Sequence, residues 1–179
     1  MHSRLKQLRL GFGVDQAAMA TLLGVTPLEW GGWEAGAALP SAEATAAMAS
    51  RLGLSTDWLR GAAVPMWGER LLAVRESVDQ RLRKLSGMQL ITVVSATTGE
   101  RIAYVLRLLQ EAAPDLFTPA YIAGWLGLSM GSTELLLKDA LDPGTPVVMR
   151  AADLTGVSED WFRMGPVVGL PEDAEGGGA

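Results

Sequence analysis

The sequence predicts an all-α protein with two tandem five-helix units joined by a helical connector. The chain aligns with itself at a shift of 103 positions without a gap, pairing Leu23-Gly24 with Leu126-Gly127 and Asp57-Trp58 with Asp160-Trp161. Apolar residues recur at spacings of three and four, which is typical of helices with one buried face. Capping residues lie where these helices should begin, and glycines lie where they should end. A fixed internal period of this kind indicates duplication of one structural unit.

The first unit is expected to hold five short helices. In chain order they run from Ser3 to Phe12, from the Asp15 cap through Leu23, from Thr26-Pro27 to about Glu34, from Ser41 to Leu52, and from Ser55 through Leu59. The second unit repeats the scheme, with its last two helices near 146–155 and 159–163. The same alignment pairs Arg4 with Arg107 and Leu5 with Leu108, which places the first helix of each unit in the same register.

Four segments follow from this division. They are residues 1–61 as the first unit, 62–98 as a helical connector, 99–166 as the second unit, and 167–179 as an acidic, glycine-rich tail expected to be disordered. Within the connector, Trp67–Leu85 has helical amphipathic spacing. Met88–Val94 is short and apolar, and periodicity leaves open a strand or a buried helix segment. Trp67 itself docks the connector on a unit or lies in a dimer interface.

The composition limits the chemistry available to the chain. It has 49% hydrophobic residues, no cysteine and a single histidine, His2. Disulfides, thiolate metal sites and histidine triads are therefore excluded. Apolar runs stay below the roughly 18 residues that a membrane span needs. We expect a cytoplasmic protein that is not an enzyme, with no catalytic residues, no metal, no cofactor and no membrane contact.

The charge balance argues against a strongly electrostatic nucleic-acid binder. The net charge is −5, whereas duplex binders draw most of their non-specific affinity from cations that neutralise phosphates. The imbalance is concentrated in residues 113–179, which hold three basic and ten acidic residues. Any contact with DNA is therefore expected from the first two-thirds of the chain.

Residues 3–61 nevertheless resemble the Cro/phage-repressor (XRE) type of helix-turn-helix domain. The resemblance rests on Arg4–Arg9, Gln16–Thr26, Trp33-Glu34-Ala35-Gly36 and the closing segment Leu52–Gly61. A degenerate second copy at about 104–165 has Leu136-Leu137 where the first has Trp33-Glu34. The resemblance implies a lambda-repressor-like fold and a transcriptional regulator that binds double-stranded DNA as a homodimer through residues 1–61. Such a protein would be nucleoid-associated.

The resemblance also implies a set of candidate DNA contacts. These are Arg4, Lys6, Arg9, Gln16, Thr26, Leu28, Glu29, Gly31 and Gly32. Gln16 would contact a phosphate, and the third helix would read base edges. That helix is poor in readers, because no Arg, Lys, Asn or Gln lies between Thr26 and Ala35.

Two further hypotheses remain open from the sequence. Arg81, Arg83 and Lys84 form a secondary basic cluster, which is a solvated helix face paired with Glu76 and Asp79, a DNA-contacting arm, or an interface. The acidic total and the third helix without base readers also favour a different function: a protein-interaction or dimerisation scaffold that uses helix-turn-helix folds without reading bases.

Overall fold

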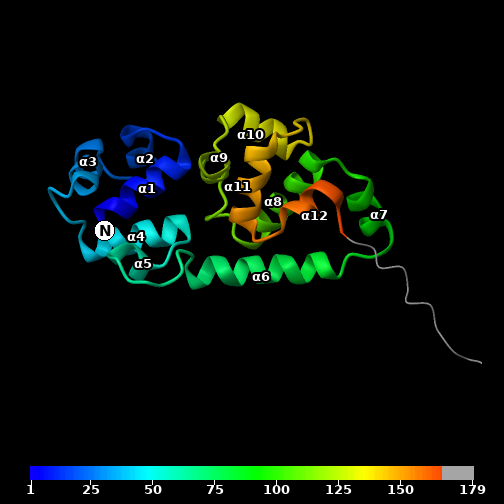
Figure 1. Cartoon of the computed structure of the whole chain (residues 1–179), viewed down its shortest axis with the longest axis horizontal. Helices are drawn as coiled ribbons and strands as arrows, with labels where there is room; N and C mark the ends of the chain where they lie inside the picture. Colours follow the sequence, from blue (N-terminus) through cyan, green and yellow to red (C-terminus); the bar gives the residue numbers. More distant parts are fainter. Residues whose placement is uncertain (167–179) are drawn as a thin grey trace, which may run out of the picture.

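The computed structural model describes residues 1–166, and within them the chain is all-α, as the sequence predicts (Figure 1). The tail predicted at 167–179 lies outside the described residues. The helices are α1 (His2–Phe12), α2 (Gln16–Leu23), α3 (Pro27–Ala35), α4 (Ala42–Leu52), α5 (Thr56–Arg60), α6 (Glu69–Arg83), α7 (Gly87–Ser95), α8 (Thr98–Ala112), α9 (Pro119–Leu126), α10 (Met130–Leu137), α11 (Thr145–Thr155) and α12 (Glu159–Met164). None of these helices combines the length and the apolar character needed to span a bilayer.

Most helices of the first set recur in the second at the shift that the sequence predicts. The bounds of α9 and α11 are those of α2 and α4 displaced by 103 positions. The turn after α2 ends on Gly24 with φ 71°, and the turn after α9 ends on Gly127 with φ 67°. Glycine adopts this left-handed backbone without steric cost, which explains its recurrence. Where Gly36 ends α3, the second set has Asp139, also with positive φ.

The first helix of each set departs from that register. Leu5, Leu8 and Phe12 are the buried side chains of α1. In α8 the equivalent pattern starts at Ile102, and Arg101, not Arg107, binds the carbonyls that end the last helix. The pairing of Arg4 with Arg107 was therefore wrong. The gapless alignment failed here because α8 and the link that follows it are both longer than α1 and its link.

The connector, residues 62–98, contains the two helices α6 and α7. The stretch Met88–Val94, which the sequence left open, lies in helix α7. Trp67 docks the connector on the second set of helices, with its ring centroid 4.9 Å from that of Trp125. The Arg75 guanidinium lies 4.4 Å from the centroid of the Trp67 ring and donates to the carbonyl oxygen of Leu154 at 2.8 Å. Burial lowers the pKa of Arg75 to about 10, so this group remains charged at neutral pH.

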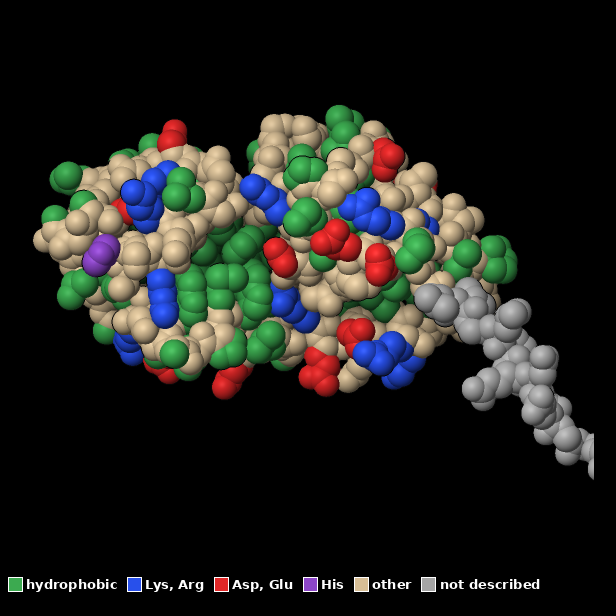
Figure 2. All heavy atoms as spheres, in the orientation of Figure 1, with side chains coloured by type: hydrophobic (Ala, Val, Ile, Leu, Met, Phe, Trp, Pro, Cys, Tyr) green, Lys and Arg blue, Asp and Glu red, His purple; other side chains and the backbone are tan. Residues whose placement is uncertain are grey.

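A continuous hydrophobic core links the two sets of helices. The rings of Phe12 and Trp125 lie 4.6 Å apart between centroids. The Tyr121 hydroxyl donates to the carbonyl oxygen of Leu52 at 2.9 Å, and its burial raises the pKa of this phenol. Figure 2 shows hydrophobic side chains gathered along the seam between the two halves. The seam is therefore a packed interface and not a flexible linker.

Gly124 permits the closest approach across this seam. A Cβ added there would overlap the Phe12 ring, lying 2.8 Å from Cε1. We expect Gly124→Ala to lower the free energy of unfolding by about 1–3 kcal/mol, since overpacking outweighs the gain in helix propensity. Chemical denaturation measures this change. The matched control is Gly131→Ala in α10, where a Cβ meets nothing within 4 Å; equal effects of the two changes would contradict the account.

Candidate nucleic-acid interface

The segment α2–turn–α3 is held by local capping interactions. The Asp15 carboxylate accepts from the Ala18 amide at 2.7 Å and so begins α2. Thr26 and Glu29 form a reciprocal capping box at the start of α3, with the Glu29 carboxylate 2.8 Å from the Thr26 amide nitrogen. Each cap satisfies amide donors that a helix start leaves unpaired. The sequence therefore fixes locally where the third helix begins and how it leaves the turn.

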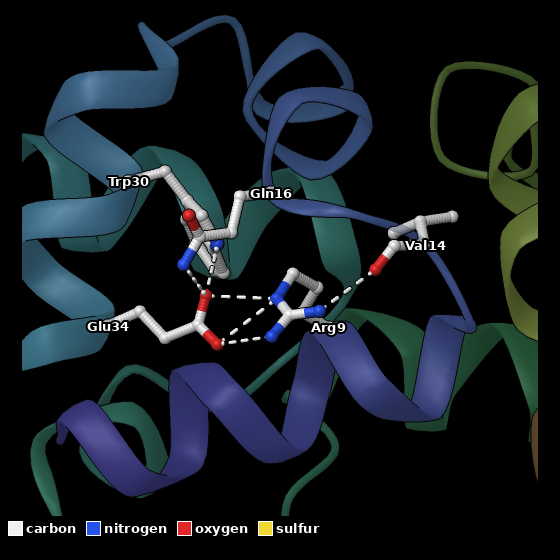
Figure 3. Close-up of polar contacts among 5 residues, drawn as sticks. All are labelled: Arg9, Val14, Gln16, Trp30 and Glu34. Atoms are coloured by element: carbon white, nitrogen blue, oxygen red, sulfur yellow. Dashed lines mark hydrogen bonds and ion pairs between the residues drawn. The ribbon is translucent and has the colours of Figure 1, made fainter.

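The inner face of α3 is anchored by one buried carboxylate. Glu34 has a side-chain exposure of 4% and accepts from the Arg9 guanidinium at 2.6 Å in a forked ion pair. It also accepts from Trp30 Nε1 at 2.9 Å and Gln16 Nε2 at 3.1 Å. Figure 3 shows these donors converging on Glu34 from α1, α2 and α3, while Arg9 also donates to the Val14 carbonyl at 3.1 Å. We call Arg9, Gln16, Trp30 and Glu34 the Glu34 cluster.

The electrostatics of this cluster favour the charged forms. The hydrogen bond from Arg9 lowers the pKa of Glu34 against the opposing effect of burial, and Gln16 and Trp30 lower it further. The same contact raises the pKa of Arg9. A buried ion pair with its remaining hydrogen bonds satisfied holds a single geometry. The cluster thus fixes α3 against α1 and α2.

Three of the candidate DNA contacts, Arg4, Arg9 and Gln16, already make hydrogen bonds within the first set of helices. Arg9 belongs to the Glu34 cluster. Arg4 donates to the carbonyl oxygens of Trp58, Gly61 and Ala62 at the end of α5 and stacks on the Trp58 ring. Their guanidinium groups hold the domain together, which is a structural use that the sequence did not predict for either. Of the three cations of α1, Lys6 has neither a hydrogen bond nor an ion pair within residues 1–166.

The outer face of α3 is exposed and uncharged apart from Glu29. Leu28 is 87% exposed, the highest value among the large hydrophobic side chains described. Glu29 is held in the capping box, where the bond from the Thr26 amide lowers its pKa. The candidate residues Thr26 and Glu29 therefore lie at the predicted surface but already serve as helix caps.

Gly31 and Gly32 lack a packing role inside the described chain. A Cβ on Gly32 would meet nothing within 4 Å, and one on Gly31 would lie 3.5 Å from Gln16 Oε1, an ordinary contact. Each glycine costs a helix roughly 1 kcal/mol relative to alanine. Intramolecular packing does not account for this cost, whereas close approach of a partner to the α3 backbone would.

The secondary basic cluster on α6 is largely neutralised. Arg83 pairs with Asp79 at 2.6 Å, as one of the sequence hypotheses held, and Arg81 pairs with Glu111 at 3.1 Å in place of the expected Glu76. Lys84 is the C-cap residue of α6 and is exposed. All three lie on a solvated face, and only Lys84 among them has no ion pair among residues 1–166.

Sequence reasoning missed two features of this surface. The Glu34 cluster joins residues from three helices, and no local pattern signals that contact. Arg51, at the end of α4, places its guanidinium over the turn glycine, with Nη1 2.6 Å from where a Gly24 Cβ would lie. The sequence held one usable signal for these contacts. Residues 10–50 contain neither Lys nor Arg, so any cation that pairs with Glu34 has to come from outside this stretch.

The counterpart of α3 in the second set of helices is α10. Its three consecutive leucines, 135–137, differ in how deeply they are buried. Leu136 is fully buried, while Leu135 is 49% exposed. Thr133 stands where Trp30 stands in α3 and is buried, donating to the Ser129 carbonyl at 2.9 Å. Leu137 replaces Glu34 at the equivalent position. The second set therefore keeps the backbone scheme of the first without its polar cluster.

Comparison with known families identifies a domain in the first third of the chain. Residues 3–62 match the family model described as "Helix-turn-helix domain". The comparisons with curated proteins and with solved structures gave no match. Residues 3–62 are thus a helix-turn-helix domain consistent with the XRE type, a class of domain typical of DNA-binding regulators.

Proposed function

We propose that the protein is a transcriptional regulator of the Cro/phage-repressor type that binds double-stranded DNA as a homodimer through α3. The observation that carries the proposal is that α3, the recognition helix of a matched helix-turn-helix segment, has an open outer face. One such helix reads a half-site, so a dimer doubles both the contacts and the sequence read.

The chemistry of α3 suits an unusual mode of readout. Leu28 offers an apolar surface to thymine methyl groups, and the half-buried backbone at Gly31 and Gly32, which carries no side chain, allows close approach to base edges. Among residues 1–166, Lys6 is the candidate cation of α1 that has no ion pair or hydrogen bond. Since each phosphate neutralised contributes a slope of about −0.9, a dimer with one such contact per protomer has a log–log salt slope of about −2.

We assign a separate role to each of the first three segments predicted from the sequence. Residues 1–61 bind DNA, residues 62–98 connect, and residues 99–166 pack against the first unit or support dimerisation. The acidic balance of the second unit suits it to a supporting role and not to duplex contact.

The test is selection of duplexes from a random library at low ionic strength, followed by fluorescence anisotropy with the enriched sequence. We expect enrichment of a two-fold symmetric site. Leu28→Ala is expected to weaken binding about tenfold, while Met88→Ala, a similarly exposed change on α7, leaves it unaltered. Failure to enrich any duplex, or equal affinity of wild type and Leu28→Ala, would overturn the proposal.

A substitution at Gly32 is expected to change the stability of the free protein and its affinity for DNA in opposite directions. Gly32→Ala is expected to raise the free energy of unfolding by about 0.5–1 kcal/mol, because alanine favours the helix and its Cβ meets nothing within 4 Å. The same methyl group should weaken binding to the selected duplex if the backbone is approached there. Denaturation and anisotropy on one variant give both readouts, and unchanged affinity would remove Gly32 from the interface.

A protein partner is the second candidate, and one observation favours it. The surface around α3 combines Leu28 and Leu39, 87% and 75% exposed, with the cation-free stretch 10–50. A surface that is apolar and poor in cations is better suited to a protein than to phosphates. Recovery of a stoichiometric protein partner that wild type binds and Leu28→Ala does not, with no enriched duplex, would favour this function over DNA binding.

A further inference from the structure

A cleft of about 670 Å³ lies between the two sets of helices. One wall is formed by the end of α1 and the face of α2, including Phe12 and Leu22. The opposite wall is formed by α9 and the start of α10, including Ala120 and Leu128. The volume falls within the roughly 300–1,000 Å³ that is usual for small-molecule sites, which are mostly apolar with a few polar groups.

The lining keeps this cleft open. Ala18 on one wall and Ala120, Ala123 and Gly124 on the other are too small to fill it. The Phe12 ring, which would otherwise be the natural plug, is fixed against Gly124 and tilted on Trp125 at 4.6 Å. The cleft is therefore a consequence of seam packing that holds the one aromatic side chain of its lining in place.

A single cation faces this largely apolar space. Arg150 extends from α11 over the turn after α9, with its Cζ 3.0 Å from where a Gly127 Cβ would lie. Within residues 1–166 it makes no hydrogen bond or ion pair, whereas Arg75, Arg101 and Arg107 all do. None of the residues that line the cleft is acidic, so no carboxylate of the lining pairs with Arg150.

We propose that this cleft binds a small organic anion with an apolar body, such as a medium-chain carboxylate, and that Arg150 pairs with its anionic group. The planar guanidinium matches a carboxylate through two parallel hydrogen bonds, which are stronger where water is scarce. The apolar body lies between α2 and α9. The ligand thus bridges the two sets of helices, and its site is separate from the outer face of α3.

The test uses the full chain and two probes. The first is 8-anilinonaphthalene-1-sulfonate, an apolar organic anion whose fluorescence rises on binding, and the second is decanoate as a competitor. We expect saturable binding of the dye, its displacement by decanoate, and a rise in Tm with decanoate, because a ligand of the native state stabilises it.

Two variants probe the site independently, and one serves as a control. Arg150→Gln removes the cation and is expected to weaken decanoate binding about tenfold or more. Ala120→Leu fills the cleft from an exposed helix position and is expected to abolish binding. Arg51→Gln removes the arginine that lies over the equivalent turn of the first half, outside this cleft, and should leave binding unchanged.

Each result decides for or against the site. Absence of saturable binding to wild type overturns the proposal. Equal affinity in Arg150→Gln or Ala120→Leu, with circular dichroism showing an intact fold, also overturns it. These results are independent of DNA binding, which is measured with the selected duplex in separate titrations.

Discussion

Glu34→Ala is expected to lower the free energy of unfolding by about 3–5 kcal/mol, as removal of one partner from a buried ion pair does. The substitution leaves the Arg9 guanidinium, 16% exposed, and the buried Trp30 indole without their acceptor. It also releases α3 from α1, so a loss of duplex binding should accompany the loss of stability. Urea denaturation measures the change. Glu76→Ala, an exposed residue of α6 without an ion pair among residues 1–166, is the control and should cost less than about 0.5 kcal/mol.

The stabilisation by Glu34 should depend on pH in a defined direction. Its pKa is lowered in the fold by the Arg9 hydrogen bond, so the stabilisation is complete above the ordinary carboxyl pKa of about 4.3 and is lost as the pH falls through the lowered value. The difference in Tm between wild type and Glu34→Gln should therefore be constant near neutrality and shrink in acid. A difference that grows as the pH falls would contradict the pairing.

Arg101→Met is the second large effect, with an expected loss of about 3–5 kcal/mol. Arg101 is 5% exposed and donates to carbonyl oxygens at the ends of α7 and α12, including Phe162 at 2.8 Å and Ala96 at 2.5 Å. Methionine keeps the volume but removes every donor, and each buried carbonyl left unpaired costs about 1–3 kcal/mol unless water reaches it. Burial lowers the pKa of Arg101, against the opposing effect of the nearby Glu100 carboxylate.

Hydrogen exchange gives the more specific readout for Arg101. The amides of α7 and α12 should exchange faster in Arg101→Met, because those two helix ends lose their shared anchor, while α2 and α3 keep their protection. Arg81→Met, which breaks an exposed ion pair with Glu111, should change stability by less than about 1 kcal/mol. Uniform loss of protection across the chain, or equal costs of the two changes, would contradict the anchoring role.

Helix ends were predictable because they depend on neighbours in the sequence. Thr26 with Glu29 defines the start of α3, and Gly24 defines the end of α2. The family of the first domain was predictable for the same reason, since its motif is a string of such local signals. The internal repeat held wherever these signals recur. It failed in α8, which ends at Ala113 without the glycine that ends α1 at Gly13.

Contacts between distant residues were not predictable. Arg9 and Arg4 are cations near the expected interface, and the sequence assigned both to DNA. Their partners, Glu34 and the carbonyls at the end of α5, come from helices that only the fold brings near. The same holds for the cleft, whose walls combine α2 with α9. Charge in a sequence indicates which groups are available for binding, and only the structure shows which are already paired.

The central claim is that α3 is the element that meets the partner. Amide hydrogen exchange of the full chain, with and without the selected duplex, tests it most directly. The account predicts added protection in Leu28–Ala35, strongest around the two glycines, and little change in α10. Protection confined to α10 or α6, with α3 unchanged, would contradict it.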